Sequence, residues 1–206
     1  MQNFWDERYK QEQFAYGERP NEYLKEKLPG LQPGKILFPL EGEGRNAVFA
    51  AQKDWQSFAF DQSSEGKKKA ELLAQKNDVH IDYAVSDMEH ISYPKNSFDA
   101  LVLVYAHFSL NKRKRHHLKL ASFLKKSGIL IIEGFSKGHI EKQKVNPNVG
   151  GPKDETMLYD LEELKNDFQG FDFVESYETD IELQEGICHV GTASVIRILA
   201  VKNKNS

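Results

Sequence analysis

The feature that most constrains the fold of this chain is an alternation of short apolar runs with segments of helical periodicity. The expected strands are residues 35–40, 55–60, 82–85, 98–105 and 128–133. The expected helices are residues 45–53, 64–76 and 111–124, the second with Ser64 as its N-cap and Leu72 and Leu73 as its buried seam. Strands this continuously apolar are buried on both faces, so the alternation predicts an α/β fold with a doubly wound parallel sheet.

The last third of the chain breaks this alternation. Residues 159–168 have a helical pattern, and two long strand patterns follow at residues 171–183 and 193–202. Only residues 184–192 lie between the two strands, which is too short for a helical crossover. The two strands are therefore expected to pair as an antiparallel hairpin at the end of the sheet.

The composition fits one soluble domain, residues 1–206, with 39% hydrophobic and 29% charged residues. Cys188 is the only cysteine, so an intramolecular disulfide is impossible. The net charge is −3 and the only strong basic run is residues 112–117, where His116 and His117 are expected on a solvated face. Nucleic-acid binding is therefore not expected.

No run of apolar residues reaches the roughly 18 residues that a spanning helix needs, so no membrane partner is expected. The first residues carry no leader pattern, and a cytoplasmic protein is the default expectation. A monomer or a homodimer is expected. Residues 136–158 form a long polar connection after the fifth strand, and such connections often contribute to binding sites.

Residues at the carboxyl ends of parallel strands are the candidates for ligand binding in such a sheet. Gly42 and Gly44 lie in a turn before a helix, where glycine allows close backbone approach and the helix N-terminus offers N–H groups to an anion. Asp61 ends the second strand, where a carboxylate can accept hydrogen bonds from both hydroxyls of a ribose. Asp87 and Met88 end the third, where an acid suits an exocyclic amine and a thioether packs on a ring. A plain turn with capping acids remains the alternative.

Two nucleotide ligands compete for this pattern. The spacing from Gly42 to Asp61 also satisfies the fingerprint of dinucleotide-binding folds. A dinucleotide usually needs a second mononucleotide-binding half, and this chain ends in a hairpin instead. Glu41 and Glu43 would repel a pyrophosphate, whereas a cationic or zwitterionic adenosyl ligand tolerates both carboxylates.

At these residues the chain resembles the class I S-adenosylmethionine-dependent methyltransferases. Residues 36–50 resemble the first motif of that family, with Phe38 where the family usually has an acid and Leu40 where it usually has a glycine. The Gly-Arg-Asn-Ala sequence that ends the motif resembles the one in the tellurite-resistance methyltransferase subgroup. The position of Pro39 resembles the motif of the thiopurine methyltransferase subgroup. The resemblance covers residues 5–202 and implies a Rossmann-like, seven-stranded, mainly parallel sheet with a C-terminal antiparallel hairpin.

The resemblance implies S-adenosylmethionine as the cofactor. The glycine turn would line its methionine and ribose portions, Asp61 would hold the ribose, and Asp87 would contact the adenine. An aromatic N-terminal segment, residues 1–30, would cover the cofactor. The implied cofactor-binding set is Trp5, Arg8, Tyr16, Glu41, Gly42, Gly44, Asn46, Asp61, Gln62, Asp87, Met88 and Tyr105.

Methyl transfer from a sulfonium releases a neutral group, so it depends on alignment and exclusion of water, with a base only for a protonated nucleophile. The catalytic candidates are Tyr105 and His107 after the fourth strand and His189 in the hairpin connection. Glu133 is a further acceptor-side candidate, whereas Cys188 is expected to serve packing. No metal site is expected, because the His, Cys and Glu residues lack ligand spacing.

The resemblance leaves the acceptor open among a small-molecule thiol, an amine and an oxyanion of selenium or tellurium. Two other classes remain as alternatives: a module that binds S-adenosylmethionine without turnover, and a small nicotinamide-dependent reductase.

Overall fold

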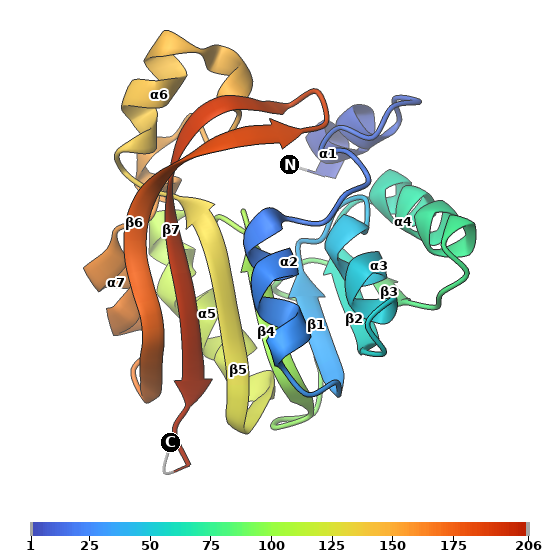
Figure 1. The fold of residues 1–206 in the computed structure, drawn as a ribbon, viewed down its shortest axis with the longest axis vertical. Helices are drawn as coiled ribbons and strands as arrows, with labels where there is room; N and C mark the ends of the chain where they lie inside the picture. Colours follow the sequence, from blue (N-terminus) through green and yellow to red (C-terminus); the bar gives the residue numbers. More distant parts are fainter. Residues whose placement is uncertain (1, 205–206) are drawn as a thin grey trace. The chain divides into compact units, whose positions relative to one another are not determined.

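The computed structural model describes residues 2–204 (Figure 1). Met1 and residues 205–206, which the single-domain prediction also includes, lie outside the described residues. Seven strands form one sheet in the order β3-β2-β1-β4-β5-β7-β6. The chain divides into two compact units. The first comprises the residues up to Ser92 together with Glu185–Ile187, and the second comprises Tyr93–Gln184 and the residues from Cys188 onward.

The first unit contains three parallel strands with their helices. The strands are β1 (Lys35–Pro39), β2 (Gln56–Asp61) and β3 (Asp82–Val85), which pair in parallel. The helices are α1 (Gln2–Tyr9), α2 (Glu22–Lys27), α3 (Arg45–Ala51) and α4 (Ser64–Lys76), with a 3-10 turn at Leu28–Gly30. The three expected strands are confirmed to within a residue at each end, because continuous burial of β1 and β2 leaves a strong apolar signal.

Helix α4 corrects two details of the sequence analysis. Its N-cap is Ser63, not Ser64, and the Ser63 hydroxyl accepts a hydrogen bond from the N–H of Gly66. Leu73 is buried beside Ala70 and Ala74, whereas Leu72 is 61% exposed. Each residue turns the helix by about 100°, so two adjacent leucines cannot both face the sheet.

The second unit contains the remaining strands, β4 (Phe98–Val104), β5 (Leu124–Phe135), β6 (Phe171–Glu185) and β7 (His189–Lys202). Strand β5 runs parallel to β4 and antiparallel to β7. Only residues 186–188 join β6 to β7, which confirms the C-terminal hairpin. The helices are α5 (Leu110–Phe123), α6 (His139–Val145) and α7 (Leu161–Asp167), with 3-10 turns at Pro147–Val149 and Glu155–Met157.

The connection at residues 136–158, expected as a long polar loop, is structured. It contains α6 and two 3-10 turns, and α6 lies against the curved part of β7 (Figure 1). The Asn146 amide donates to the carbonyl of Val190, and the Gln143 amide donates to the carbonyl of Gly150. The first bond fixes the connection to the hairpin, and the second fixes the connection to itself, all within the second unit. Within residues 2–204, no helix is long and apolar enough to cross a bilayer.

Candidate functional site

The glycine turn after β1 is shaped by close packing. Gly42 has φ +63°, and a Cβ there would lie 2.5 Å from the Tyr9 hydroxyl oxygen. Gly44 has φ +86°, and a Cβ there would lie 2.4 Å from the Cβ of Ala70 in α4. Both positions therefore require glycine. Leu40 also has a positive φ, 53°, at the position where the resembled family usually has a glycine.

The first carboxylate of the turn closes the N-terminus of α3. Glu41 Oε1 accepts hydrogen bonds from the N–H groups of Asn46 (2.7 Å) and Ala47 (2.8 Å). This corrects the expectation that the helix N-terminus offers these N–H groups to an anionic ligand, because the protein supplies its own carboxylate. Burial raises the pKa of Glu41 to about 7, against the lowering effect of those hydrogen bonds.

Two more carboxylates lie at the turn. Asp61 accepts from the N–H groups of Gly42 and Ser63, and burial raises its pKa to about 6. Glu43 is buried and pairs with Lys69 at 2.8 Å; its burial raises its pKa from the ordinary value. The Tyr83 hydroxyl donates to the carbonyl of Gly42 at 2.6 Å. The turn is thus surrounded by acids, and a cation there would be favoured electrostatically.

The three residues predicted to cover a cofactor lie together in the first unit. The Arg8 guanidinium donates to the Tyr16 hydroxyl at 2.7 Å and lies 5.4 Å from the centre of the Trp5 ring. Trp5 stacks on Tyr9, whose hydroxyl packs on Gly42. The Ser63 hydroxyl donates to Asp6 of α1 at 2.6 Å, so α1 is anchored beside the N-terminus of α4.

The other predicted cofactor residues occupy the ends of β2 and β3 and the start of α3. Asn46 accepts from the N–H of Asn21 at 2.9 Å, which ties the segment before α2 to the turn. Asp87 Oδ1 accepts from the N–H groups of Glu89 and His90; the His90 hydrogen bond is the main cause of its lowered pKa. Met88 is buried, and Gln62, beside Asp61, is half-buried. Asp87 therefore caps a turn, which is the alternative to adenine binding that its sequence position left open.

Tyr105 follows β4 in the second unit and has a left-handed backbone, with φ 52°. Its N–H donates to the carbonyl of Glu133 at 2.8 Å, and its hydroxyl donates to Glu133 Oε1, also at 2.8 Å. Its ring stacks on Phe135, 4.6 Å between centres. A bulky residue in this region of φ is strained by roughly 1–3 kcal/mol, and such strain concentrates at functional sites.

His107 has a structural environment that argues against its predicted role as a base. Its Nε2 accepts from the N–H of Phe135 at 3.0 Å, so Nδ1 carries the proton and donates to the carbonyl of Met157 at 2.8 Å. Burial lowers the pKa of His107 to about 3. Both nitrogens bind main chain, and a group so hard to protonate is a poor proton acceptor.

His189 is buried at the start of β7. Its ring meets Tyr105 edge-on at 4.8 Å and Phe135 at 5.3 Å between centres. Gly150, in the connection predicted to border the acceptor, packs so closely that a Cβ would lie 2.4 Å from His189 Cδ2. Tyr105, His189 and the connection at residues 136–158 therefore lie together, while Cys188 is half-buried.

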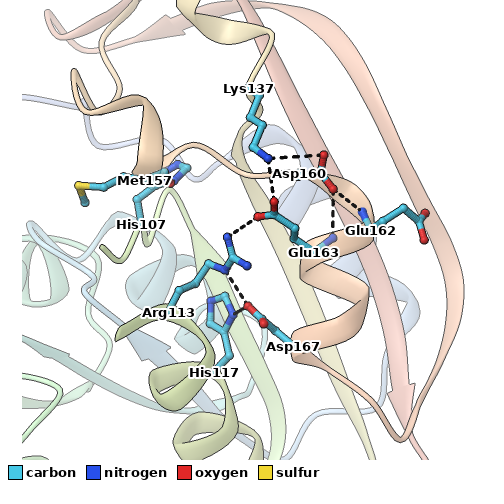
Figure 2. Close-up of polar contacts among 9 residues, drawn as sticks. All are labelled: His107, Arg113, His117, Lys137, Met157, Asp160, Glu162, Glu163 and Asp167. Atoms are coloured by element: carbon cyan, nitrogen blue, oxygen red, sulfur yellow. Dashed lines mark hydrogen bonds and ion pairs between the residues drawn. The ribbon is translucent and has the colours of Figure 1, made fainter. Parts of the chain in front are cut away.

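An ionic network that the sequence did not predict joins α5 to α7, and its Arg113–Asp167 pair is buried (Figure 2). Arg113 donates to Asp167 at 2.7 Å and to Glu163 at 2.8 Å, and Lys137 binds Glu163 at 2.8 Å. His117 Nδ1 lies 2.9 Å from Asp167, and its ring is fully buried. His116 is buried as well, so the expected solvated face is wrong for both histidines: they pack against Phe108.

Arg197 was not among the site residues predicted from the sequence. It lies opposite Glu133 in the ladder of β5 and β7, and its Nε donates to Glu133 Oε2 at 2.6 Å. A signal was present, because Arg197 is the only charged residue within the apolar run of residues 193–201. A lone charge in a buried strand needs a partner, and Glu133 is the charge in the neighbouring apolar run. Among residues 2–204 there is no group of three or more His, Cys, Asp or Glu suited to a metal ion.

A family model described as a methyltransferase domain matches residues 41–132, which include the glycine turn, Asp61 and Asp87. No curated protein matches the sequence. A protein from a structural study on converting a disulfide bond into a thioacetal group during echinomycin biosynthesis is 17% identical, with 100% of this chain and 93% of that chain covered and a TM-score of 0.79.

Two further solved structures are similar. TehB from Haemophilus influenzae is 15% identical, with 98% of this chain and 67% of that chain covered and a TM-score of 0.71. Magnesium protoporphyrin IX methyltransferase from Synechocystis PCC 6803, solved with bound SAH, is 14% identical, with coverages of 88% and 82% and a TM-score of 0.66. With the strand order described above, these likenesses confirm the predicted fold: the chain has the Rossmann-like fold of the S-adenosylmethionine-dependent methyltransferases.

Proposed function

We propose that this chain is an S-adenosylmethionine-dependent methyltransferase with a small-molecule acceptor. The observation that carries the proposal is the match of residues 41–132 to a methyltransferase domain, on a chain with that fold throughout. The matched segment begins at Glu41 and contains the glycine turn and the acids at the ends of β2 and β3. These are the residues where the sequence predicted an adenosyl ligand.

The charge of the first unit fits this cofactor. S-adenosylmethionine carries a sulfonium, which makes it more positive by one charge than its thioether product. Glu41, Glu43 and Asp61 gather at the glycine turn, and burial raises the pKa of each despite the hydrogen bonds and the Lys69 ion pair that favour the charged forms. A bound cation would favour the charged forms further. The same acids disfavour the pyrophosphate of a nicotinamide dinucleotide.

We assign the cofactor roles within the first unit as follows. Asp61 holds the ribose hydroxyls as well as the turn, because an ionised carboxylate has about four acceptor sites and the main-chain N–H groups of Gly42, Gln62 and Ser63 do not use all of them. Asp87 accepts from the adenine amine, and Met88 packs on the ring. Trp5, Arg8 and Tyr16 form the cover, with Arg8 as the group that suits a carboxylate.

We assign the acceptor to the second unit, at Tyr105, His189 and the connection at residues 136–158. S-adenosylmethionine supplies a methyl group on a good leaving group, so the residues of this chain need only orient the acceptor and exclude water. Alignment of this kind lowers the barrier by roughly 7–11 kcal/mol in well-oriented reactions. An aromatic surface from buried Phe135 and His189 and half-buried Tyr105 suits the exclusion of water.

The direct test is transfer of a labelled methyl group. The purified protein is incubated with methyl-labelled S-adenosylmethionine and one acceptor of each class: a thiol, an amine, selenite and tellurite. We expect label in the product of at least one class. Binding of S-adenosylmethionine with no transfer to any class would favour a non-catalytic binding module. Binding of reduced nicotinamide dinucleotide in place of S-adenosylmethionine would favour a reductase.

A further inference from the structure

Three side-chain oxygen atoms converge beside Gly138, the residue that precedes α6. A Cβ added to Gly138 would lie 3.0 Å from Glu178 Oε1 and 3.2 Å from Ser194 Oγ. It would lie 3.4 Å from Ser136 Oγ. These oxygens come from β6, from β7 and from the residue that follows β5, so all three belong to the second unit. Three separate segments therefore direct oxygen atoms at one position.

Ser136 supplies a polar atom that lacks a partner at this position. Its side chain is fully buried, and its hydroxyl oxygen has no hydrogen-bond partner among residues 2–204. The Ser136 main chain is fixed, because its N–H donates to the carbonyl of Ser194 and its carbonyl accepts from the N–H of His139, both at 3.0 Å. Buried hydroxyls in folded proteins are normally satisfied, so a species that enters beside Gly138 would supply the missing partner.

The charge at this position favours a cation. Within the described part of the chain Glu178 forms no ion pair, whereas Asp180 on the same strand is paired with Lys142. The Glu178 carboxylate would repel an anion. The Ser194 hydroxyl donates its one proton to Glu178 at 3.4 Å, which leaves its oxygen with lone pairs for a ligand.

The charge balance also indicates the valence of the cation. Asp180 and Lys142 compensate each other, so Glu178 contributes one uncompensated negative charge, and the two hydroxyls contribute none. A singly charged cation balances this set. Calcium and magnesium prefer sites with more carboxylate ligands or retain most of their own water. The second unit offers no such set, because no group of three or more His, Cys, Asp or Glu suited to a metal occurs among the described residues.

We propose that Ser136, Glu178 and Ser194 bind a monovalent cation, sodium or potassium, beside Gly138. Water molecules would complete its coordination. The ion would link the end of β5 to the β6–β7 hairpin at the base of α6, and so hold the connection at residues 136–158 against the hairpin. This inference does not depend on the proposed function, because cation binding is measured without cofactor or acceptor.

Thermal unfolding in different salts tests the site. The protein is unfolded in about 0.2 M sodium chloride, potassium chloride or tetramethylammonium chloride, whose methylated cation is too bulky to lie among three oxygens. We expect the Tm to be about 3–6 °C higher in the sodium or the potassium salt than in the tetramethylammonium salt, as a ligand at roughly ten times its Kd gives for a chain of this size. Equal Tm values in all three salts would overturn the proposal.

Gly138→Ala is the sharpest variant, because it keeps all three oxygens and places a methyl group in contact with them. Gly138 has φ −64°, which alanine adopts readily, so this variant is expected to fold. The difference between salts should disappear in Gly138→Ala and in Glu178→Gln. Glu182→Gln is the matched control: Glu182 lies on the same strand and accepts from the Thr192 hydroxyl, and its variant should keep the full difference.

The remaining outcomes also decide the proposal. A difference between salts that persists in Gly138→Ala would be a bulk effect of the salts and would contradict the site. A larger rise in Tm from about 1 mM calcium or magnesium chloride would contradict the assigned valence. If Glu178→Gln fails to fold, Gly138→Ala alone separates site binding from bulk effects. Binding of S-adenosylmethionine is measured separately by calorimetry, and its failure would reject the proposed function without affecting this result.

Discussion

The carboxylate of Asp61, at the end of β2, accepts a hydrogen bond from the main-chain N–H of Gly42 at 3.2 Å. This bond joins the second strand to the turn that follows the first. The same carboxylate also accepts from the N–H of Ser63, at the N-cap of α4. A single acidic side chain thus organises the turn and the residues proposed to hold the ribose.

Replacement of Asp61 by asparagine tests both roles. An amide has one acceptor oxygen where the carboxylate has two, so one N–H group loses its partner. We expect Asp61→Asn to lower the free energy of unfolding by about 1–3 kcal/mol and to weaken S-adenosylmethionine binding by roughly 1.5–3 kcal/mol. Thermal unfolding and calorimetry measure the two effects. Asp82→Asn is the matched control, because Asp82 is exposed at the start of β3; equal losses in both variants would contradict the role of Asp61.

The raised carboxyl pKa values at the turn predict opposite pH trends for stability and cofactor binding. Burial raises the pKa of Glu41 from 4.5 to about 7 and that of Asp61 from 3.8 to about 6. Between about pH 4 and pH 7 the folded protein then holds more protons than the unfolded chain, so this contribution to stability falls as pH rises. A cationic ligand prefers the ionised carboxylates, so its affinity rises over the same range.

Measurements at about pH 5.5 and about pH 8 separate the two trends. Calorimetry should give tighter S-adenosylmethionine binding at the higher pH, and the change should be smaller in Glu41→Gln. An affinity that does not change with pH, or one that falls as pH rises, would show that these carboxylates do not face the cation.

Gly44 allows α3 and α4 to approach each other. A Cβ at Gly44 would meet the Cβ of Ala70 at 2.4 Å, and its φ of +86° disfavours any other residue. We expect Gly44→Ala to cost about 2–4 kcal/mol of stability from overpacking and backbone strain together. Gly30→Ala is the matched control, since no atom lies within 4 Å of a Cβ there. Denaturant unfolding compares the two variants, and equal stabilities would refute the packing role.

The network around Asp167 predicts a large effect from one charge (Figure 2). Asp167 accepts from the buried Arg113 and binds His117. Removing that carboxylate leaves the guanidinium buried without its closest partner, and we expect Asp167→Asn to cost about 3–5 kcal/mol. Glu162→Gln on the same helix removes an exposed pair with Lys165 and should cost at most about 1 kcal/mol. Chemical denaturation of both variants tests the contrast.

The sequence predicted the fold well because its signals are local and strong. The buried runs of β1, β2 and β4 and the short connection between β6 and β7 each fix an element without knowledge of its neighbours. The structure of residues 136–158 was missed because α6 is short and polar. Its position depends on contacts with the β6–β7 hairpin, such as Asn146 with Val190.

The candidate site was predicted only in part. Residues at strand ends were found because topology brings strand ends to one edge of a sheet. The role of His107 was misjudged because both of its partners are main-chain groups, at Phe135 and Met157, and main-chain partners leave no mark in a sequence. Arg197 was missed because its partner Glu133 is 64 residues away, and only the register of β5 and β7 pairs them.

The measurement that tests the central claim most directly is a calorimetric titration of the full chain with S-adenosylmethionine, repeated with reduced nicotinamide dinucleotide. The proposed function predicts saturable binding of one S-adenosylmethionine per chain and no binding of the dinucleotide. The absence of S-adenosylmethionine binding to the folded protein, or tighter binding of the dinucleotide, would contradict it.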